Sequence, residues 1–126
     1  MATVGERILV IDDDRTVLTY LKAVLCREGY RVFTALDALR GPMVARQTQP
    51  DLVVLDLAMP GGGGTALLER LRLMQGMMQV PVVVYSGLAR DRMEELVPKG
   101  PDLRFVPKPG TPEEMLGAIR SLLDGH

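Results

Sequence analysis

The sequence contains one cysteine, one histidine and no long run of apolar residues. Cys26 can form no internal disulfide and has no partners at the spacing of a zinc site, which suits a reducing compartment. The only histidine, His126, is the last residue. We therefore do not expect this chain to supply an internal histidine as a base, metal ligand or phosphohistidine.

The sequence also lacks an excess of charge of either sign. Its 15 basic and 16 acidic residues give a net charge of −1, which argues against binding nucleic acid or anionic membranes through bulk charge. No apolar stretch approaches the roughly 18 to 20 residues of a membrane span, and the first residues do not form a signal peptide. These absences predict a cytoplasmic protein that contacts neither a membrane nor nucleic acid directly.

The length and composition predict one globular domain. The chain has 126 residues, of which 47% are hydrophobic and 25% charged, as in an ordinary globular protein with one core. We expect a single domain over residues 1–126, with its core at about 7–123 and short terminal extensions at 1–6 and 124–126.

Short β-rich runs alternate with segments of helical periodicity along the whole chain. This alternation is typical of an α/β fold with a parallel sheet. The expected strands cover residues 8–11, 30–35, 52–55, 80–85 and 103–106. The expected helices cover about 17–25, 38–47, 65–74, 90–97 and 112–123.

Local signals refine three of the helices. Asp14 is placed to cap the first helix, on which we expect Cys26 to be a small buried residue. Gly41-Pro42 interrupts the second helix, which we therefore expect to be short, kinked or restarted with Pro42 in its first turn. Thr111 and Glu114 form a capping box at the start of the last helix.

Polar side chains follow four of the expected strands. Asp12 and Asp13 follow the first strand, Asp56 the third, Ser86 the fourth and Lys108 the fifth. If the strand order is 2-1-3-4-5, the carboxylates of strands one and three face each other at the edge where such sheets bind ligands. Two carboxylates about 4 Å apart repel by roughly 4 kcal/mol at a dielectric near 20, so the cluster needs either a cation or a raised pKa of one carboxyl. Mg²⁺ suits these oxygens, and Lys108 and Ser86 suit a phosphoryl group on one carboxylate.

With these motifs the chain resembles the receiver domain of two-component response regulators, including the single-domain chemotaxis type. The matching residues are the acidic pair Asp12 and Asp13, the pattern Asp56-x-x-Met59-Pro60-x-x-x-Gly64, Ser86, and Lys108-Pro109. The resemblance covers about residues 7–123. It implies a flavodoxin-like, doubly wound (βα)5 fold with a five-stranded parallel sheet in the order 2-1-3-4-5.

The resemblance also implies a phosphorylation reaction. Asp56 would accept a phosphoryl group from a phosphohistidine of a histidine kinase or histidine phosphotransfer protein. Asp13, Asp56 and the backbone carbonyl of Ala58 would ligate Mg²⁺, with Mn²⁺ as a substitute, and Asp12 would act through water. Lys108 and the backbone amide of Ala58 would bind the phosphoryl oxygens.

Further residues complete the implied site and its switch. The hydroxyl of Ser86 and the backbone amide of Gly87 would also bind phosphoryl oxygens, and the Lys108–Pro109 peptide bond would be cis. Ser86 and Phe105 would form the switch that repacks the surface of the fourth helix, fifth strand and fifth helix. The alternative, which we consider the weaker of the two, is that Phe105 is a half-buried strand aromatic with no switch role.

The chain departs from the family pattern in two places. Ala58 and Leu88 stand where family members often carry polar side chains that orient the hydrolytic water, which predicts slow autodephosphorylation. Four consecutive glycines, residues 61–64, lack the Lys-Ser/Thr ending of a nucleotide-binding loop, and we interpret them as a phosphorylation-sensitive hinge.

Several functions are compatible with this reading. The favoured one is a phosphoacceptor domain that is not a kinase by itself, either free-standing or the receiver part of a hybrid histidine kinase, as a monomer or a phosphorylation-dependent dimer. A haloacid-dehalogenase-like phosphatase needs a second acid where Ala58 stands. The alternative is a phosphorylation-independent pseudo-receiver; retention of Asp13, Asp56, Ser86 and Lys108 together argues against it. Separately, Asp12 and Asp13 could act only as helix caps, which their occurrence alongside Asp56 and Lys108 disfavours.

Overall fold

The computed structural model describes residues 5–60 and 63–124 as a five-stranded parallel sheet with helices on both faces. The strand order is β2-β1-β3-β4-β5, which is the predicted flavodoxin-like order. The strands are β1 (Arg7–Ile11), β2 (Arg31–Ala35), β3 (Leu52–Leu55), β4 (Val82–Ser86) and β5 (Leu103–Pro107). The helices are α1 (Arg15–Arg27), α2 (Arg40–Thr48), α3 (Gly63–Leu73), α4 (Arg90–Leu96) and α5 (Pro112–Asp124).

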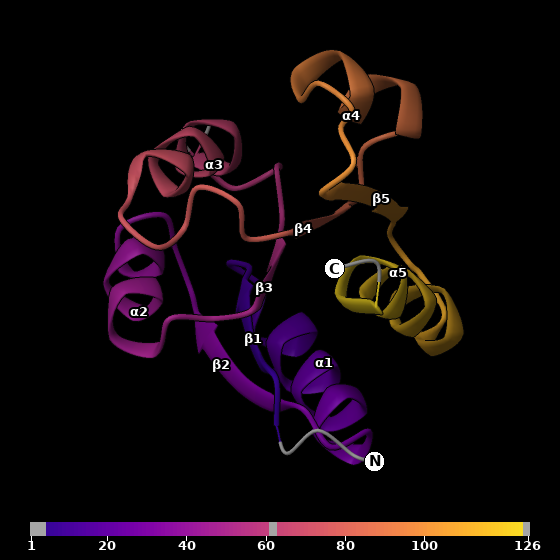
Figure 1. The fold of residues 1–126 in the computed structure, drawn as a ribbon. Helices are drawn as coiled ribbons and strands as arrows, with labels where there is room; N and C mark the ends of the chain where they lie inside the picture. Colours follow the sequence, from indigo (N-terminus) through magenta and orange to yellow (C-terminus); the bar gives the residue numbers. More distant parts are fainter. Residues whose placement is uncertain (1–4, 61–62, 125–126) are drawn as a thin grey trace.

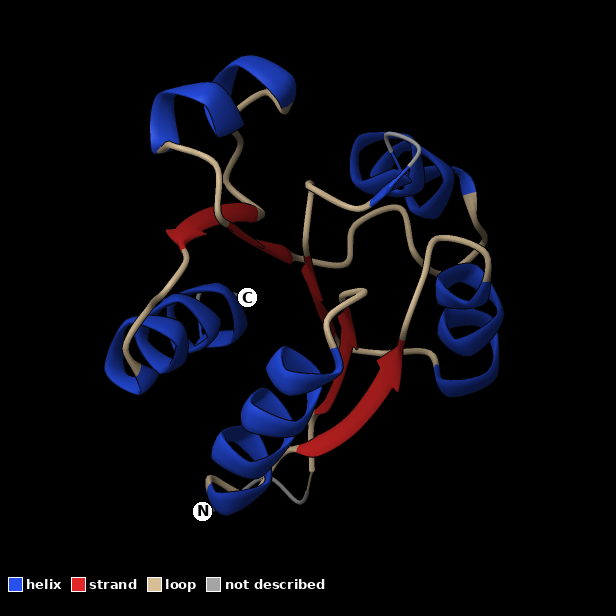
Figure 2. Cartoon of the chain, turned by 180° about the vertical axis from the view of Figure 1, so that it is seen from behind, coloured by secondary structure: helices blue, strands red, loops and turns tan. Residues whose placement is uncertain are grey.

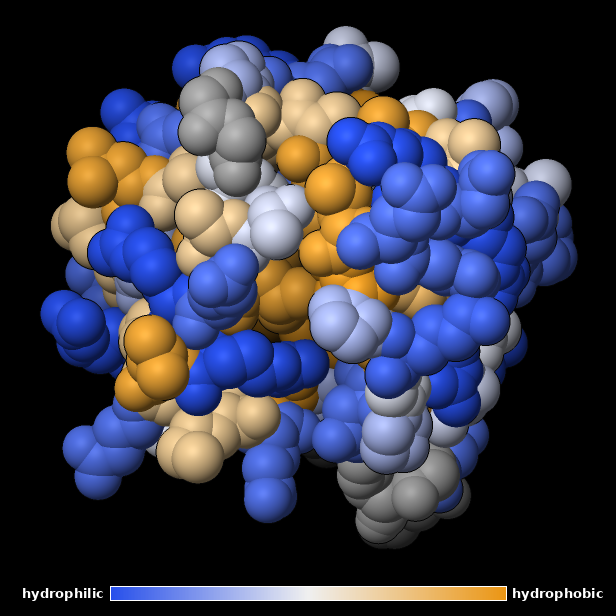
Figure 3. All heavy atoms as spheres, turned by 90° about the horizontal axis from the view of Figure 1, so that it is seen from above, coloured by the Kyte–Doolittle hydropathy of each residue, from blue (hydrophilic) through white to orange (hydrophobic). Residues whose placement is uncertain are grey.

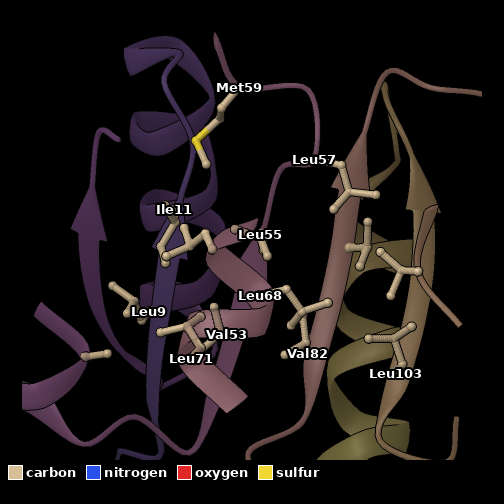
Figure 4. Close-up of a cluster of buried hydrophobic side chains, with 14 of the residues drawn as sticks. Leu9, Ile11, Val53, Leu55, Leu57, Met59, Leu68, Leu71, Val82 and Leu103 are labelled. Atoms are coloured by element: carbon tan, nitrogen blue, oxygen red, sulfur yellow. The ribbon is translucent and has the colours of Figure 1, made fainter. Parts of the chain in front are cut away.

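The sheet lies between two helical layers (Figures 1 and 2). Helices α1 and α5 cover one face, and α2, α3 and α4 cover the other. Successive residues of a strand point to opposite faces, so the central strands supply both cores. Leu9, Ile11, Val53 and Leu55 face Leu68 and Leu71 of α3 (Figure 4). The central strands are therefore apolar throughout, as the sequence indicated.

Helix α1 begins at its predicted cap but does not bury its cysteine. The Asp14 side chain accepts a hydrogen bond from the Thr16 N–H at 2.9 Å. Leu21 and Leu25 are buried, whereas Cys26 is exposed. The prediction of a buried cysteine was wrong because Cys26 lies about 100° around the helix from Leu25, off the face that packs on the sheet.

Helix α2 begins at Arg40, so the Gly41-Pro42 pair lies in its first turn and does not interrupt it. Pro42 lies in the first turn, where a missing N–H costs no intrahelical hydrogen bond. The side chain of Asp37 accepts hydrogen bonds from the N–H groups of Leu39 and Arg40 at 3.1 and 2.7 Å. A β-carbon at Gly41 would lie 3.0 Å from Ile11 Cδ1, so this glycine allows α2 to approach β1 closely.

The remaining boundaries agree with the predictions to within two residues, and β3 coincides with its predicted range. Strand β4 extends to Ser86 because Ser86 pairs with Pro107 in the β4–β5 ladder. The capping box of α5 is present: the Thr111 N–H donates to Glu114 Oε1 at 3.2 Å, and the Glu114 N–H donates to Thr111 Oγ1 at 3.1 Å. Across residues 5–60 and 63–124, no helix has the length and apolar character needed to cross a membrane.

Candidate functional site

Two neighbouring strands bring three carboxylates together at the carboxyl edge of the sheet. Strand β1 pairs with β3 so that Ile11 lies opposite Leu55, and Asp12 and Asp56 are the next residues. One oxygen from each of Asp12, Asp13 and Asp56 lies within 4.8 Å of the others. Asp12 and Asp56 are 2% and 5% exposed, whereas Asp13 is exposed to solvent. Solvent therefore reaches the cluster at Asp13, whereas the carboxylates of Asp12 and Asp56 lie inside the protein.

Each buried carboxylate accepts a hydrogen bond from the backbone two residues further on. The Asp14 N–H donates to Asp12 Oδ1 at 2.9 Å, and the Ala58 N–H donates to Asp56 Oδ1 at 2.9 Å. These bonds hold one oxygen of each carboxylate in place and leave the second oxygen, Oδ2, for another partner. Ala58 itself is exposed, so the backbone at this position borders solvent.

Lys108 supplies that partner for both acids. Its Nζ donates to Asp12 Oδ2 at 2.7 Å and to Asp56 Oδ2 at 3.3 Å. The backbone places the side chain, because the Lys108 N–H donates to the Ser86 carbonyl oxygen at 2.7 Å. The Lys108–Pro109 peptide bond is cis, the isomer that the family resemblance implies.

The site is negative overall, with one ammonium against three carboxylates. Burial raises the pKa of the Asp12 carboxyl, because lost solvation outweighs the hydrogen bonds from Lys108 and the Asp14 N–H. For Lys108, burial lowers the pKa of the ammonium, but the hydrogen bond and charge of Asp12 and the charge of Asp56 raise it above its ordinary value. Lys108 is therefore charged at neutral pH and only partly balances the acids.

Ser86 is the last residue of strand β4, and Gly87 and Leu88 follow it in the loop next to the carboxylates. Ser86 is fully buried, and its Oγ accepts a hydrogen bond from the Leu88 N–H at 3.3 Å. No heavy atom lies within 4 Å of the place where a β-carbon of Gly87 would be, so the backbone there is accessible. The Leu88 side chain is half-buried against the core shared with α3 and α4, and does not offer a polar group to the site.

Gly64 sets the distance between α3 and the loop that carries Asp56. A β-carbon at Gly64 would overlap the carbonyl oxygen of Asp56 and the backbone of Leu57. This explains the glycine of the Asp56-x-x-Met59-Pro60-x-x-x-Gly64 pattern, since only glycine permits such close packing. The predicted hinge falls partly outside the described residues, at Gly61 and Gly62, whereas Gly63 and Gly64 begin α3.

Phe105, the predicted switch residue, is buried in the middle of β5. Its side chain is 7% exposed and lies in the core shared by α3 and α4. The guanidinium of Arg90, at the start of α4, lies 6.0 Å from the ring centroid and also pairs with Glu94 at 3.2 Å. The ring is thus covered by the helix that follows Ser86.

Tyr85 is a residue of the site that the sequence analysis missed. It precedes Ser86 in β4, so its side chain points to the opposite face of the sheet, where it is buried near α1 and α5. The Nζ of Lys108 lies 5.4 Å from the centroid of its ring. Only its position next to Ser86 could have drawn attention to it.

A separate apolar groove lies between α3 and the segment that joins α4 to β5, away from the carboxylates. It has a volume of about 560 Å³, and its lining includes Leu68, Val97, Pro101 and Leu103. From above, a strip of apolar side chains is visible between hydrophilic regions on this face (Figure 3). The groove contains no residue of the carboxylate cluster and is not part of the candidate site.

Comparisons with known proteins agree with the observed fold. Residues 8–120 match the family described as "Response regulator receiver domain". The DNA-binding dual master transcriptional regulator RpaA of Synechocystis is 35% identical over 93% of this chain and 48% of its own length. The chain spans about half the length of three of the curated relatives it matches.

Two other known proteins match over almost their whole length. Sporulation initiation phosphotransferase F of Bacillus subtilis is 29% identical over 94% of both chains. The solved structure of the Vibrio cholerae chemotaxis protein CheY4 superimposes with a TM-score of 0.87 at 20% identity, covering 94% of this chain and 99% of that one. The second likeness concerns the fold alone.

Proposed function

The chain belongs to the response regulator receiver family of two-component signalling, and from this premise we propose that Asp56 is its phosphoacceptor. The observation that carries the proposal is the cluster of Asp12, Asp13 and Asp56 with the ammonium of Lys108 bonded to two of them. A buried carboxylate beside a fixed cation can gain a phosphoryl group whose charge is balanced at once.

In the proposed reaction an Asp56 carboxylate oxygen attacks the phosphorus of a phosphohistidine. The new O–P bond forms as the P–N bond breaks, and the electron pair stays on the imidazole nitrogen of the donor, which is protonated. Lys108 and the Ala58 N–H already donate hydrogen bonds to Asp56, so they are placed to donate to the phosphoryl oxygens once these are attached. The Ser86 hydroxyl and the Gly87 N–H bind further oxygens. Positioning and charge balance carry such a transfer.

The donor set fits Mg²⁺, which receiver domains bind at an acidic pocket. We propose that Asp13, Asp56 and the carbonyl of Ala58 hold the ion and that Asp12 acts through water. These are hard oxygen ligands, and the three carboxylates together exceed the charge of Lys108. When bound, Mg²⁺ neutralises the charge that develops on the phosphoryl oxygens. Mn²⁺ would bind the same ligands.

Incubation with acetyl phosphate tests the proposal. With Mg²⁺, intact-mass analysis should show one phosphoryl adduct per chain, and the adduct should be absent from Asp56→Asn and from samples with excess chelator. Glu69→Gln, on the exposed surface of α3, is the matched control and should be labelled like the parent. Mg²⁺ binding without any adduct would favour the phosphorylation-independent interaction module.

The output of phosphorylation is proposed to be the surface of α4, β5 and α5. Ser86 would move toward the phosphoryl group, and the ring of Phe105 would occupy the space that it leaves. The contact of Arg90 with this ring connects the change to α4. A histidine kinase or histidine phosphotransfer protein is the expected phosphodonor, since receiver domains interact with such proteins.

The place of the domain in a pathway is also a proposal. It acts in the cytoplasm, either free-standing or as the receiver of a hybrid kinase, as a monomer or a phosphorylation-dependent dimer, and as a phosphoacceptor rather than a kinase. The predicted absence of direct nucleic-acid contact has no support among the relatives, because one of them is a DNA-binding transcriptional regulator spanning about twice this length.

Slow autodephosphorylation is expected from Ala58 and Leu88. Ala58 has no polar side chain, and Leu88 packs into the core, so neither can orient a water molecule for attack on the phosphoryl group. Ala58→Asn and Leu88→Glu should each shorten the half-life of the phosphorylated protein by about threefold to tenfold. The decay of the adduct after removal of the phosphodonor gives the half-life. If neither variant shortens it, the explanation for a long lifetime is wrong.

A further inference from the structure

Tyr85 contacts both the side chain of Lys108 and the loop that follows Lys108. Its ring is 5% exposed, and the Lys108 Nζ lies 5.4 Å from the ring centroid, within the range of a cation–π interaction. The same ammonium bonds to Asp12 at 2.7 Å but to Asp56 at only 3.3 Å. The ammonium therefore has a tighter partner on the Asp12 side, and the ring of Tyr85 is a third group that fixes its position.

The hydroxyl of Tyr85 fixes the loop that carries Lys108. The Gly110 N–H, two residues after Lys108, donates to the Tyr85 hydroxyl oxygen at 3.2 Å. A β-carbon at Gly110 would lie 3.3 Å from Tyr85 Cε1 and 2.9 Å from Val106 Cγ1, so the loop rests directly on the ring. One side chain thus contacts both the ammonium and the backbone of the β5–α5 loop.

We infer that Tyr85 is a positioning residue for phosphoryl transfer, holding the Lys108 ammonium over the Asp56 carboxylate. The inference rests on the proposed role of Lys108 in binding the phosphoryl group. Without the ring and its hydroxyl, the loop loses two contacts and the ammonium moves toward Asp12, its closer partner. Phosphorylation then slows, whereas the oxygen ligands proposed for Mg²⁺ stay in place.

The test is the rate of phosphorylation by acetyl phosphate at saturating Mg²⁺, with the Mg²⁺ dissociation constant measured separately by calorimetry. Tyr85→Leu should slow the reaction about threefold to tenfold with an unchanged dissociation constant. Tyr85→Phe keeps the ring and should restore the rate to within about twofold of the parent. Tyr30→Leu is the matched control, since Tyr30 packs against the same core cluster and precedes β2 at the opposite end of the sheet.

A double-mutant cycle separates positioning from general packing. In the Lys108→Gln background, Tyr85→Leu should have no further effect, because the group that it positions is gone. An equal loss of rate in both backgrounds, or a loss equalled by Tyr30→Leu, would show that Tyr85 acts only through core packing. A Tyr85→Leu protein as fast as the parent would overturn the inference while leaving the phosphoacceptor role of Asp56 intact.

A second readout does not depend on phosphorylation. The ε-methylene proton resonances of Lys108, assigned with Lys108→Gln, should be shifted upfield by the ring current of Tyr85 in the parent and in Tyr85→Phe. The shift should vanish in Tyr85→Leu. If the parent takes up no phosphoryl group, the proposed function fails, and these resonances still decide whether the ring holds the ammonium. Resonances at the position of exposed lysines in the parent would overturn the inference.

Discussion

Lys108→Gln is expected to slow the phosphorylation of Asp56 about a hundredfold and, in the opposite direction, to tighten Mg²⁺ binding. The rate falls because the ammonium that bonds to Asp56 Oδ2 is removed, and the loss of one such donor costs roughly 10²-fold to 10³-fold in comparable sites. Mg²⁺ binds more tightly, by about threefold or more, because a competing positive charge leaves the carboxylates. Phosphorylation kinetics and calorimetry measure the two effects.

Lys99→Gln removes the same charge without touching the site. Lys99 pairs with Glu94 at 3.3 Å, and its side chain is 71% exposed. This control should leave both the rate and the Mg²⁺ affinity close to those of the parent. A Lys108→Gln protein that is phosphorylated at the parental rate would contradict the assignment of Lys108 to the phosphoryl group. Weaker Mg²⁺ binding by Lys108→Gln than by the parent would instead indicate that Lys108 holds the carboxylates in the geometry that binds the ion.

Gly64→Ala is expected to reduce the free energy of unfolding by about 3 kcal/mol. The added methyl group would overlap the Asp56 carbonyl oxygen and the Leu57 backbone, neither of which can rotate away as a flexible side chain would. Helix α3 must then move off the loop, and buried contacts such as that of Leu67 with the core are loosened. Urea denaturation of the parent and variant measures the change.

Gly117→Ala is the matched control, and its expected effect has the opposite sign. Gly117 lies inside α5, is exposed, and would have no heavy atom within 4 Å of an added β-carbon. Alanine there should stabilise the protein by about 0.5 to 1 kcal/mol, because it removes the conformational freedom of glycine in the unfolded chain. Equal stability of Gly64→Ala and the parent would mean that α3 does not pack on the loop as described.

The fold could be predicted because its signals are local and consistent. Continuous apolar runs mark the buried strands, and polar residues directly after Ile11, Leu55 and Tyr85 mark their carboxyl ends. Parallel pairing then brings these ends to one edge, so Asp12, Asp56 and Lys108 could be placed together without knowing any distance. The strand order itself came from the family resemblance and not from periodicity.

The failed and missed predictions concern side-chain direction and tertiary contact. Cys26 was expected to be buried, but it is exposed because it lies one residue after the buried Leu25, about 100° further around α1. Asp37 stands directly before the expected second helix and accepts hydrogen bonds from the N–H groups of Leu39 and Arg40, a start signal that the sequence analysis did not use. Tyr85 belongs to the site through the loop after β5, a contact between residues 25 positions apart that no short motif records.

The unequal distances of Lys108 from Asp12 and Asp56 could not be predicted from the sequence. The sequence predicts that Lys108 faces a phosphoryl group on Asp56, but not that the lysine bonds more closely to Asp12 at 2.7 Å. That distance depends on the register of β4 and β5 and on the loop that follows them. The preference for Asp12 explains why a further group is needed to keep the ammonium near Asp56.

Borohydride reduction of the phosphorylated protein, followed by peptide mass mapping, tests the central claim most directly. The reagent reduces an acyl phosphate to an alcohol, so a phosphorylated aspartate becomes homoserine, whereas free carboxylates and phosphate esters are unchanged. After incubation with Mg²⁺ and acetyl phosphate, homoserine should be found at position 56 and at no other aspartate. Homoserine at Asp12 or Asp13, or a phosphoryl adduct that leaves residue 56 unreduced, would contradict the assignment of Asp56 as the phosphoacceptor.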